Sequence, residues 1–554
     1  MEQRNYIDIY RGEEFVHAAY PKKRDCYVKL KEYVEQEPAP MGKICALYGI
    51  RRTGKTVMMQ QCIAEMPEKQ KKQSVYLLCK TGCDMYQLQF ALNELIRQEG
   101  MKNIFIDEIT ELEDFQVYGN ALSDGYPILG ARIIVAGTDS LGIGLAEMNI
   151  LYDRVEEIHT SHVSYAEFSR LLGGKSLDEY IEFGGTLTDS PYKTKQSRDQ
   201  YLNSAIVNNI LHSLEKNEEV RKHRTVLTEL YDQDELVSVI NKMINKFSYQ
   251  ITVKAIQKYF KSAPLYSTLN NMRNSDIIDG LAVEDVNRAV RKALHVKDRE
   301  EMTTVLREND LEELKFYLKE LDLFLEIPCY RSWKHGGKEN PLEIILQPGM
   351  VYAQATALTE ILSKDEYWNA SCQIENQNEF KKRADHFVKG ILLENILLSE
   401  TYLWLQEVDA KEYYVSQLSV LLPEIKKTAE ADMLILDQKH QEVHLFEIKH
   451  SDKIVEEQTR HLRNELFLNY IRENFGEVKS RSVIYLGVDQ KVENPSGEIS
   501  YWNAEKFLER VHKMHVEKKV DFAELLFAGT ERKQNLSAKK KTTERKMSDR
   551  APKL

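Results

Sequence analysis

The stretch that decides the fold reads LYGIRRTGKT and occupies residues 47–56. It follows a short apolar run at 44–48 and precedes a stretch with helical character at 57–66. Gly-x4-Gly-Lys-Thr between a strand and a helix is the pattern of a phosphate-binding P-loop, because its glycines let backbone N–H groups converge on phosphate oxygens. The alternative is a glycine-rich turn with a surface lysine. The residues expected to hold the phosphates are Gly49, Arg51, Arg52, Thr53, Gly54, Lys55 and Thr56, with the Thr56 hydroxyl placed to bind Mg²⁺.

Apolar runs and helical stretches alternate after this loop. Short apolar runs lie at 74–79, 103–108 and 132–137, and the residues between them read as helices. A lead-in helix is expected at 22–36, before the loop. Apolar strands that alternate with helices predict a parallel sheet covered on both faces, the α/β sheet of a P-loop NTPase.

Two further polar groups follow strands of this predicted sheet. Asp107 ends the run at 103–108, where an aspartate can hold the Mg²⁺ that Thr56 also touches, and Glu108 is the expected general base for the attacking water. The next strand ends in GTDS at 137–140, where Thr138 or Asp139 is a candidate sensor of the γ-phosphate. The alternative is that Asp139 or Ser140 caps a helix.

Composition sets the outer limits of the interpretation. The chain has 554 residues and a formal net charge of −11, which predicts three or four domains and argues against a protein coated in nucleic acid. The first residues lack the basic-then-apolar layout of a signal peptide, and no run approaches a membrane span. The seven cysteines are scattered. We therefore expect a cytoplasmic protein with reduced thiols and no membrane partner.

Three later motifs carry a family resemblance: LYDRV at 151–155, SYAEF at 164–168 and YIEFGG at 180–185. With the P-loop, the sequence resembles a large group of bacterial and archaeal AAA-type ATP-binding proteins that join an ATPase domain to a C-terminal region of restriction-endonuclease-like type. The resemblance implies ATP and Mg²⁺ as cofactors. It also implies that Arg154 contacts the γ-phosphate, in cis or from a second copy of the chain, although Asp153 replaces the usual glycine. The alternative is a surface arginine paired with Glu156 or Glu157.

The middle of the chain, 198–365, is expected to be helical with a winged-helix-like end. A helix at 310–323 leads into strand-like runs at 324–333 and 342–346, joined by a glycine-marked turn. A winged helix binds DNA or serves as a packing module between domains. The helix at 310–323 carries mostly acidic residues, which makes it a poor surface for a phosphate backbone.

The C-terminal constellation lies in AEADMLILDQKHQEVHLFEIKH at 429–450. Two apolar runs flank a polar turn, which predicts a hairpin. If the loop is 438–441 and Asp437 pairs with Glu442, then Asp432 lies opposite Glu447. In the same register Glu430 lies opposite Lys449, and all four side chains share one face.

This cluster has two interpretations. In the first, Asp432 and Glu447 bind Mg²⁺ and Lys449 activates the water that attacks a phosphodiester. Asp-x14-Glu-x-Lys is the PD-(D/E)xK nuclease pattern that the resemblance also implies, and Glu394, in an apolar helix, fits as a further acid. Gln458, in an expected helix at 453–475, is another candidate. In the second, Lys449 pairs with Glu430 or Glu447 in a salt-bridged cluster that no longer cuts.

The predicted organisation therefore has five parts: a lead-in helix at 1–40, a P-loop ATPase domain at 41–197, the helical and winged-helix-like region at 198–365, a PD-(D/E)xK nuclease-like α/β domain at 366–530, and a basic disordered tail at 531–554. The expected function is an ATPase coupled to a domain that cleaves or binds DNA. The alternative is an ATP-dependent switch with an inactive nuclease-like domain. DNA and a second copy of the chain are the candidate partners.

Overall fold

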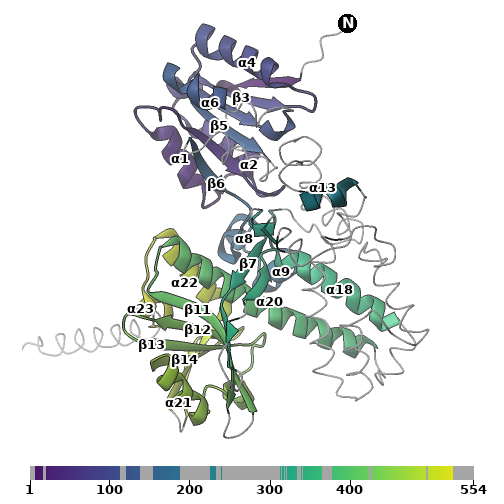
Figure 1. Ribbon diagram of the computed structural model, residues 1–554, viewed down its shortest axis with the longest axis vertical. Helices are drawn as coiled ribbons and strands as arrows, with labels where there is room; N and C mark the ends of the chain where they lie inside the picture. The colour runs from purple at the N-terminus through teal and green to yellow at the C-terminus, as the bar shows by residue number, and fades with distance from the viewer. Residues whose placement is uncertain are drawn as a thin grey trace, which may run out of the picture. The chain divides into compact units, whose positions relative to one another are not determined.

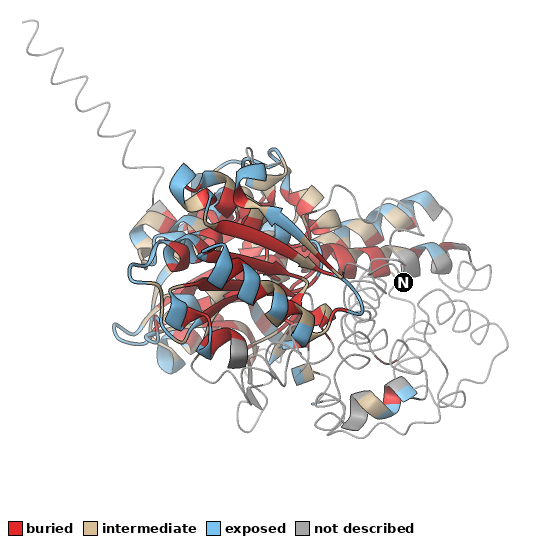
Figure 2. Ribbon diagram, turned by 90° about the horizontal axis from the view of Figure 1, so that it is seen from above, coloured by how far each residue is buried: buried red, intermediate tan, exposed pale blue. Residues whose placement is uncertain are grey.

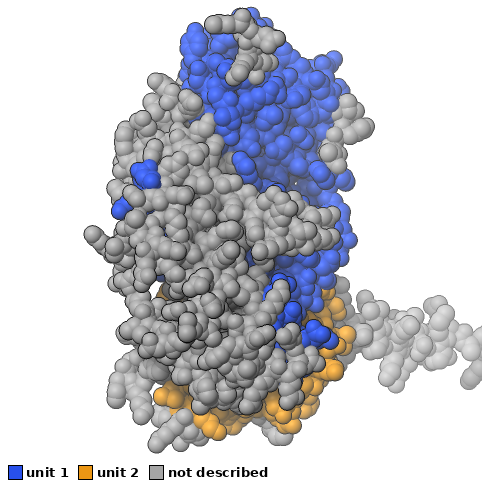
Figure 3. Space-filling model, turned by 90° about the vertical axis from the view of Figure 1, so that its right-hand side faces the viewer, with its two compact units in different colours: residues 1–325, 344–392 blue, residues 326–343, 393–554 orange. Residues whose placement is uncertain are grey.

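The computed structural model describes residues 6–15, 20–112, 120–137, 154–187, 225–232, 239, 312, 315–316, 318–319, 321–332, 338–339, 341–364, 377–422, 427–494 and 497–527. The chain divides into two compact units (Figure 3). Unit 1 contains Met1–Leu325 and Ile344–Leu392, and unit 2 contains Glu326–Glu343 and Leu393–Leu554. The division differs from the expected boundary at 365/366, because one helix and one hairpin each run from the first unit into the second.

The core of unit 1 is a six-stranded sheet (Figure 1). Its strand order is β1-β3-β4-β5-β2-β6, and all neighbours are parallel except β1, which runs antiparallel to β3. The strands are β1 (Ile7–Arg11), β2 (Ile44–Tyr48), β3 (Ser74–Cys79), β4 (Asn103–Asp107), β5 (Arg132–Gly137) and β6 (Val155–His159). The predicted parallel α/β sheet is confirmed.

Helices cover both faces of this sheet, so its central strands are buried throughout (Figure 2). Side chains of β2 alternate between two apolar cores. Ile44 and Ala46 join Leu88 of α4 (Met85–Asn93). Cys45 and Leu47 join residues of α1 (Tyr27–Glu35) and α2 (Lys55–Glu65) on the other face. The shorter elements of the unit are α3 (Glu68–Lys71), α6 (Asn120–Asp124), η1 (Gly12–Glu14), η2 (Glu94–Gln98), η3 (Ile109–Glu111) and η4 (Pro127–Leu129).

The lead-in helix begins later than expected. Helix α1 starts at Tyr27 rather than at residue 22, and the residues before it pass through bends and a turn. This irregular segment carries Arg24, whose side chain is buried. The predicted helical periodicity therefore extended too far toward the N-terminus.

The other described residues of unit 1 form helices and a short pair of strands. Helix α9 (Leu177–Phe183) packs against both α8 (Tyr165–Leu171) and α18 (Pro348–Lys364). The Gly349 N–H donates to the Gly184 carbonyl at 3.2 Å, which joins the YIEFGG segment to the start of α18. The other described elements are α13 (Thr225–Asp232), β7 (Phe324–Ile327), β10 (Leu342–Ile345) and the first part of α20 (Gln377–Glu407).

Unit 2 is built on an eight-stranded mixed sheet with the order β15-β16-β14-β13-β12-β11-β8-β9. The strands β11, β12 and β13 form an antiparallel meander, and β14 returns parallel to β13 after helix α21. The elements are β8 (Cys329–Ser332), β9 (Lys338–Glu339), β11 (Tyr413–Leu422), β12 (Lys427–Asp437), β13 (Glu442–Ile448), η6 (Glu456–Thr459), α21 (Glu465–Asn474), β14 (Glu477–Tyr485), β15 (Gln490–Asn494), β16 (Gly497–Asn503), α22 (Ala504–Val516) and α23 (Phe522–Phe527).

The hairpin predicted for the winged helix forms, but it does not make a free wing. Strand β7 pairs with β10, and β8 pairs with β9. The strand is interrupted between β7 and β8 at Pro328, which has no backbone N–H to donate. Strand β8 also pairs in parallel with β11, so the outer part of the hairpin extends the sheet of unit 2. Most of the helix at 310–323 lies outside the described residues, so the winged helix stays a prediction.

The register of the C-terminal hairpin matches the prediction. Asp437 lies opposite Glu442, and the pairing runs to Met433 opposite Phe446. The pairing stops there, before Asp432 and Glu447.

Among the residues that the structure describes, no helix is both long and apolar enough to cross a membrane. The six cysteines within the described ranges are free thiols.

Several predictions from the sequence lie outside the described residues. These are the sensor candidates Thr138 and Asp139, nearly all of the stretch at 198–300, most of the helix at 310–323, and the tail at 531–554.

Candidate functional site

The P-loop joins the carboxyl end of β2 to the start of α2. Gly49 has a φ of 142° and Gly54 a φ of 92°. A Cβ atom on Gly49 would lie 2.6 Å from the Thr160 hydroxyl, so only glycine fits at this position. Arg52 adopts a left-handed φ of 67° between them. The loop therefore has the tight curvature that the sequence pattern predicts.

Side chains of the loop hold its own backbone. The Thr53 hydroxyl donates to the Ile50 carbonyl at 2.9 Å and contacts the Thr160 hydroxyl at 2.8 Å. The Lys55 ammonium donates to the carbonyls of Gly49 and Ile50 at 2.7 and 2.9 Å. Lys55 is buried, and burial lowers its pKa to about 8. A buried ammonium that donates to two backbone carbonyls is poised to take an anionic ligand.

The predicted metal ligands meet at this loop. The Thr56 hydroxyl donates to the Asp107 carboxylate at 2.6 Å, across 51 residues of sequence. Tyr76 of β3 donates to the same oxygen at 2.6 Å. Hydroxyl and carboxylate oxygens are the ligands that Mg²⁺ prefers, and it completes its shell with water and phosphate oxygens. The pair therefore fits Mg²⁺ bound together with a triphosphate.

Glu108 lies beside this pair in a strained backbone conformation. Its φ is 53°, and its N–H donates to the neighbouring Asp107 carboxylate at 3.0 Å. Its negative charge acts on Lys55, where it opposes the effect of burial on the lysine pKa. A non-glycine residue in the left-handed region is unusual, and such strain is concentrated at functional sites. Glu108 therefore lies within electrostatic reach of the P-loop lysine, and its role as general base stays a prediction.

Arg154 does not reach this site within the same chain. It immediately precedes β6, and its carbonyl accepts from the Ile44 N–H at 2.9 Å, at the amino end of β2. The P-loop lies at the opposite, carboxyl end of β2, about 15 Å away for a five-residue strand. Arg154 instead pairs with Asp124 at 2.7 Å. The predicted contact in cis is wrong, as is the predicted pairing with Glu156 or Glu157; a contact in trans stays a prediction.

Sequence reasoning missed three residues around the P-loop. Tyr76 orients Asp107, as described above. Arg24 and Glu167 form a buried ion pair of 2.7 Å beneath the loop. Glu167 is the acid of the SYAEF motif, so the motif was visible in the sequence but its partner was not.

The C-terminal cluster is centred on Lys449. Its ammonium lies 2.7 Å from Asp432 Oδ2 and 2.7 Å from Glu447 Oε2. Asp432 Oδ2 also accepts from the Ile448 N–H at 2.7 Å. The other oxygen of Glu447 lies 3.3 Å from His461 Nδ1. The cluster is therefore a network of cations and carboxylates that neutralise one another.

Electrostatics in this cluster follow from partial burial. Burial and the charge of Asp432 raise the pKa of Glu447. Burial would lower the pKa of Lys449, but the carboxylates of Asp432, Glu447 and Glu394 outweigh it and raise that pKa. The contact with Glu447 raises the pKa of His461. Glu394 of α20 is thus close enough for its charge to act on Lys449, and its role as a metal ligand stays a prediction.

Two other predicted members of the cluster lie elsewhere. Glu430 is exposed, and its carboxylate accepts from Ser419 of β11 at 3.2 Å. The Gln458 amide closes its own loop, accepting from the Val455 N–H at 3.1 Å and donating to the Lys453 carbonyl at 3.1 Å. The helix expected at 453–475 is in fact two elements, η6 and α21, and the described contacts of the Gln458 side chain lie within its own segment.

The two carboxylates expected to bind a divalent cation are occupied by one ammonium. The Lys449 ammonium bridges the two carboxylates that were expected to be ligands. Within the described ranges, no group of three or more His, Cys, Asp or Glu side chains is arranged to hold a metal ion. Lys449 is therefore paired with Asp432 and Glu447 rather than with Glu430, and both interpretations of the cluster stay predictions.

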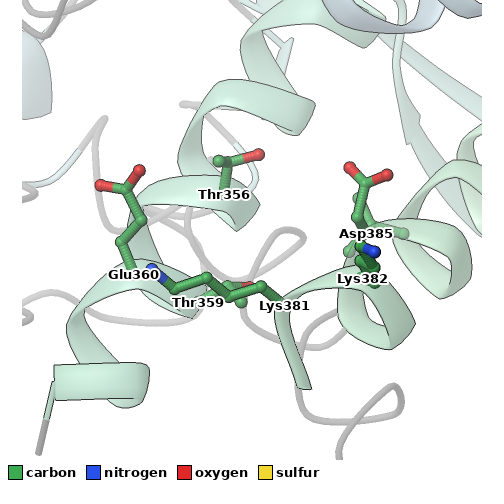
Figure 4. A pocket seen from close by; sticks show the side chains of 7 residues that line it. Thr356, Thr359, Glu360, Lys381, Lys382 and Asp385 are labelled. Carbon is green, nitrogen blue, oxygen red and sulfur yellow. The ribbon is translucent and has the colours of Figure 1, made fainter. Parts of the chain in front are cut away.

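A cavity of about 270 Å³ lies between α18 and α20 in unit 1 (Figure 4). Thr356, Thr359 and Glu360 line it from α18. Lys381, Lys382, Asp385 and Val388 line it from α20. None of the predicted site residues contributes to it.

Known proteins resemble parts of this chain. Residues 41–169 match the family model described as an AAA domain. The uncharacterized protein MJ1544 of Methanocaldococcus jannaschii is 25% identical over 260 residues, which cover 41% of this chain and 57% of that protein. The chain therefore spans a little over half the length of this curated relative.

Among solved structures, the Walker-type ATPase PABY2304 of Pyrococcus abyssi aligns with a TM-score of 0.26 and 13% identity, covering 62% of this chain and 97% of that one. The Hsp104:casein complex of S. cerevisiae aligns with a TM-score of 0.25 and 14% identity, covering 52% and 53%. The family match and the geometry of the P-loop together support an AAA-type ATPase domain in this chain.

Proposed function

We propose that this protein binds ATP with Mg²⁺ at the P-loop and hydrolyses it. The observation that carries the proposal is the 2.6 Å contact between Thr56 and Asp107, which brings two hard oxygen ligands together beside the buried Lys55. The match to the AAA domain over residues 41–169 supports the same function.

Each residue has a role in this proposal. Lys55 and the N–H groups of the loop bind the phosphates, and Arg51 and Arg52 lie exposed at its rim. Thr56 and Asp107 would hold Mg²⁺, which neutralises phosphate charge when bound. Glu108 accepts the proton of the attacking water.

Phosphate release from ATP tests this function. Wild-type protein is expected to hydrolyse ATP with Mg²⁺, and Lys55→Ala is expected to lose both nucleotide binding and turnover. Lys80→Ala is the matched control, because Lys80 is a half-exposed lysine of the same unit, paired with Asp8. Absence of nucleotide binding by the wild type would refute the proposal.

For unit 2 we propose a restriction-endonuclease-like domain that binds DNA without cutting it. The order α20, β11, β12, β13, α21, β14, with three antiparallel strands and a parallel fourth, supports this fold. The bridging position of Lys449 between Asp432 and Glu447 favours the non-cleaving form over the predicted nuclease.

DNA binding and DNA cleavage are measured separately to test this second proposal. Supercoiled, linear and single-stranded DNA are incubated with the protein and Mg²⁺ or Mn²⁺, with and without ATP, and binding is followed by gel shift. A shift without nicking is the expected result. Nicking that Asp432→Ala abolishes would contradict the non-cleaving form and restore the nuclease prediction. Nicking that survives Asp432→Ala would point to a contaminating nuclease.

A further inference from the structure

The guanidinium of Arg24 lies beneath the P-loop with all of its donors used. Nε and Nη2 bind the two Glu167 oxygens at 2.7 and 3.2 Å. Nη1 donates to the carbonyl of Thr53 and, at 3.0 Å, to that of Thr160. Nη2 also donates to the His162 carbonyl at 2.8 Å. An arginine has five N–H donors, and here five acceptors surround them.

This arrangement fixes one side of the P-loop. The Thr53 carbonyl turns toward Arg24, and the Arg52 carbonyl accepts from the Leu187 N–H at 3.0 Å. In a planar trans peptide the carbonyl and the following N–H point in opposite directions. The N–H groups of Thr53 and Gly54 therefore point away from these partners, as phosphate binding requires.

The acid that holds Arg24 is equally buried. Glu167 belongs to α8, and its carboxylate also accepts from the Asp25 N–H at 2.7 Å. Arg24 is 6% exposed and Glu167 is 3% exposed. A buried ion pair adds little net stability compared with apolar residues of similar size, so its presence calls for a specific role.

We propose that Arg24, held by Glu167, is a positioning residue that sets the conformation of the P-loop for binding nucleotide phosphates. The inference rests on the proposed ATP-binding function. Arg24 lies outside the loop, touches only its backbone, and acts through the Thr53 carbonyl. It also links the loop to the SYAEF motif, which otherwise has no part in the site.

Binding of ADP with Mg²⁺ to the full chain, followed by calorimetry, tests the proposal. In Arg24→Met/Glu167→Met both charges are removed together, so no buried charge is left unpaired. We expect an ADP Kd at least tenfold weaker than wild type. In steady-state hydrolysis, the KM for ATP rises at least tenfold while kcat stays within about threefold, because Glu108 is untouched.

Arg24→Lys keeps the positive charge but cannot span the five acceptors. Its ADP Kd tests the proposal if the double variant does not fold. A several-fold weaker Kd is expected. The matched control is Tyr33→Phe, which removes a buried hydroxyl that donates to the carbonyls of Lys43 and Ile133 at the other end of the sheet. Its Kd is expected to match wild type.

A Kd within twofold of wild type in folded Arg24→Lys, or in the folded double variant, overturns the proposal. A Kd weakened equally in Tyr33→Phe also overturns it, because the effect would then be general destabilisation. If wild-type protein does not bind nucleotide, the proposed ATP-binding function is refuted, and this inference is refuted with it.

Discussion

The Thr56 hydroxyl donates a 2.6 Å hydrogen bond to the carboxylate of Asp107, although strand β5 lies between the strands that precede these two residues. Thr56 sits in the first turn of α2, directly after β2, and Asp107 ends β4. Parallel strands bring their carboxyl ends to one edge of the sheet, so both residues face the same space. This contact places the two proposed Mg²⁺ ligands against the P-loop.

Replacing Glu108 with glutamine should slow ATP turnover by a factor of about 100 or more, the usual contribution of a general base. Nucleotide affinity should remain close to wild type, because the amide keeps the size of the carboxyl group. Steady-state hydrolysis and ADP calorimetry measure the two effects. Glu111→Gln is the control, since Glu111 lies three residues further on and accepts from Thr81 at 2.9 Å. Unchanged turnover in Glu108→Gln would remove Glu108 as the base.

Replacing Tyr76 with phenylalanine should raise the Mg²⁺ concentration needed for half-maximal hydrolysis by several fold. Tyr76 and Thr56 both donate to Asp107 Oδ2, so removing the Tyr76 hydroxyl leaves that oxygen with Thr56 as its donor and holds the carboxylate less firmly. One such hydrogen bond contributes about 1 kcal/mol. Tyr27→Phe is the matched control, because Tyr27 donates to the distant Glu65 at 3.1 Å. Equal Mg²⁺ curves for the two variants would contradict the role of Tyr76.

Replacing Arg154 with alanine should leave hydrolysis within twofold of wild type wherever the protein is monomeric. Its exposed pair with Asp124 contributes at most about 1 kcal/mol. Light scattering in the assay buffer gives the oligomeric state, and Asp124→Ala removes the same ion pair without the arginine. A large loss of activity confined to Arg154→Ala in an oligomer would support contact in trans, whereas the same loss in a monomer would contradict the structure.

Replacing Lys449 with methionine should destabilise the β12–β13 hairpin by about 3 kcal/mol, because it leaves two carboxylates without their cation. Hydrogen exchange followed by mass spectrometry measures protection of this hairpin within the full chain. Lys479→Met is the control, since Lys479 forms an exposed pair with Glu442. Equal protection of the hairpin in both variants would show that the Lys449 cluster does not stabilise it.

Unit 2 should lose stability as the pH falls from about 6.5 to 4. Burial lowers the pKa of His444 to about 4 in the folded state, against an ordinary value near 6.5. The unfolded state therefore binds the proton first, and the contribution is complete above 6.5 and lost toward 4, up to about 3 kcal/mol. Exchange protection of β13 in wild type and His444→Gln gives the difference, with His515→Gln as a surface control. Parallel pH curves for wild type and His444→Gln would refute the assignment.

The sequence was informative where local pattern and chemistry coincide. The P-loop spacing, the apolar runs of β2–β5 and the polar turn at 438–441 each depend on residues close together in the chain. These patterns correctly predicted the parallel sheet, the meeting of Thr56 with Asp107, and the register of Asp437 opposite Glu442. Period-two alternation fixes a register because a slip of one residue would turn every apolar side chain to the wrong face.

Where the prediction failed, the deciding contact joined distant segments. Strand β8, expected in the wing of a winged helix, pairs with β11 and extends the sheet of unit 2. The end of pairing at Met433 freed Asp432 to cap the Ile448 N–H and bind Lys449. Arg154 lies at the end of β6 that is opposite to the P-loop. A sequence motif gives the order of residues along the chain but not the edge of the sheet at which each residue lies.

The sequence by itself determined that a phosphate-binding loop stands between a strand and a helix, and that an acid follows a later strand. Those features depend on glycine's backbone freedom and on side-chain periodicity, which are properties of neighbouring residues. Only the tertiary structure decided that Arg24 and Glu167 hold that loop from below, and that Lys449 bridges Asp432 and Glu447. Buried charges find partners wherever folding brings them together, and sequence distance does not limit that choice.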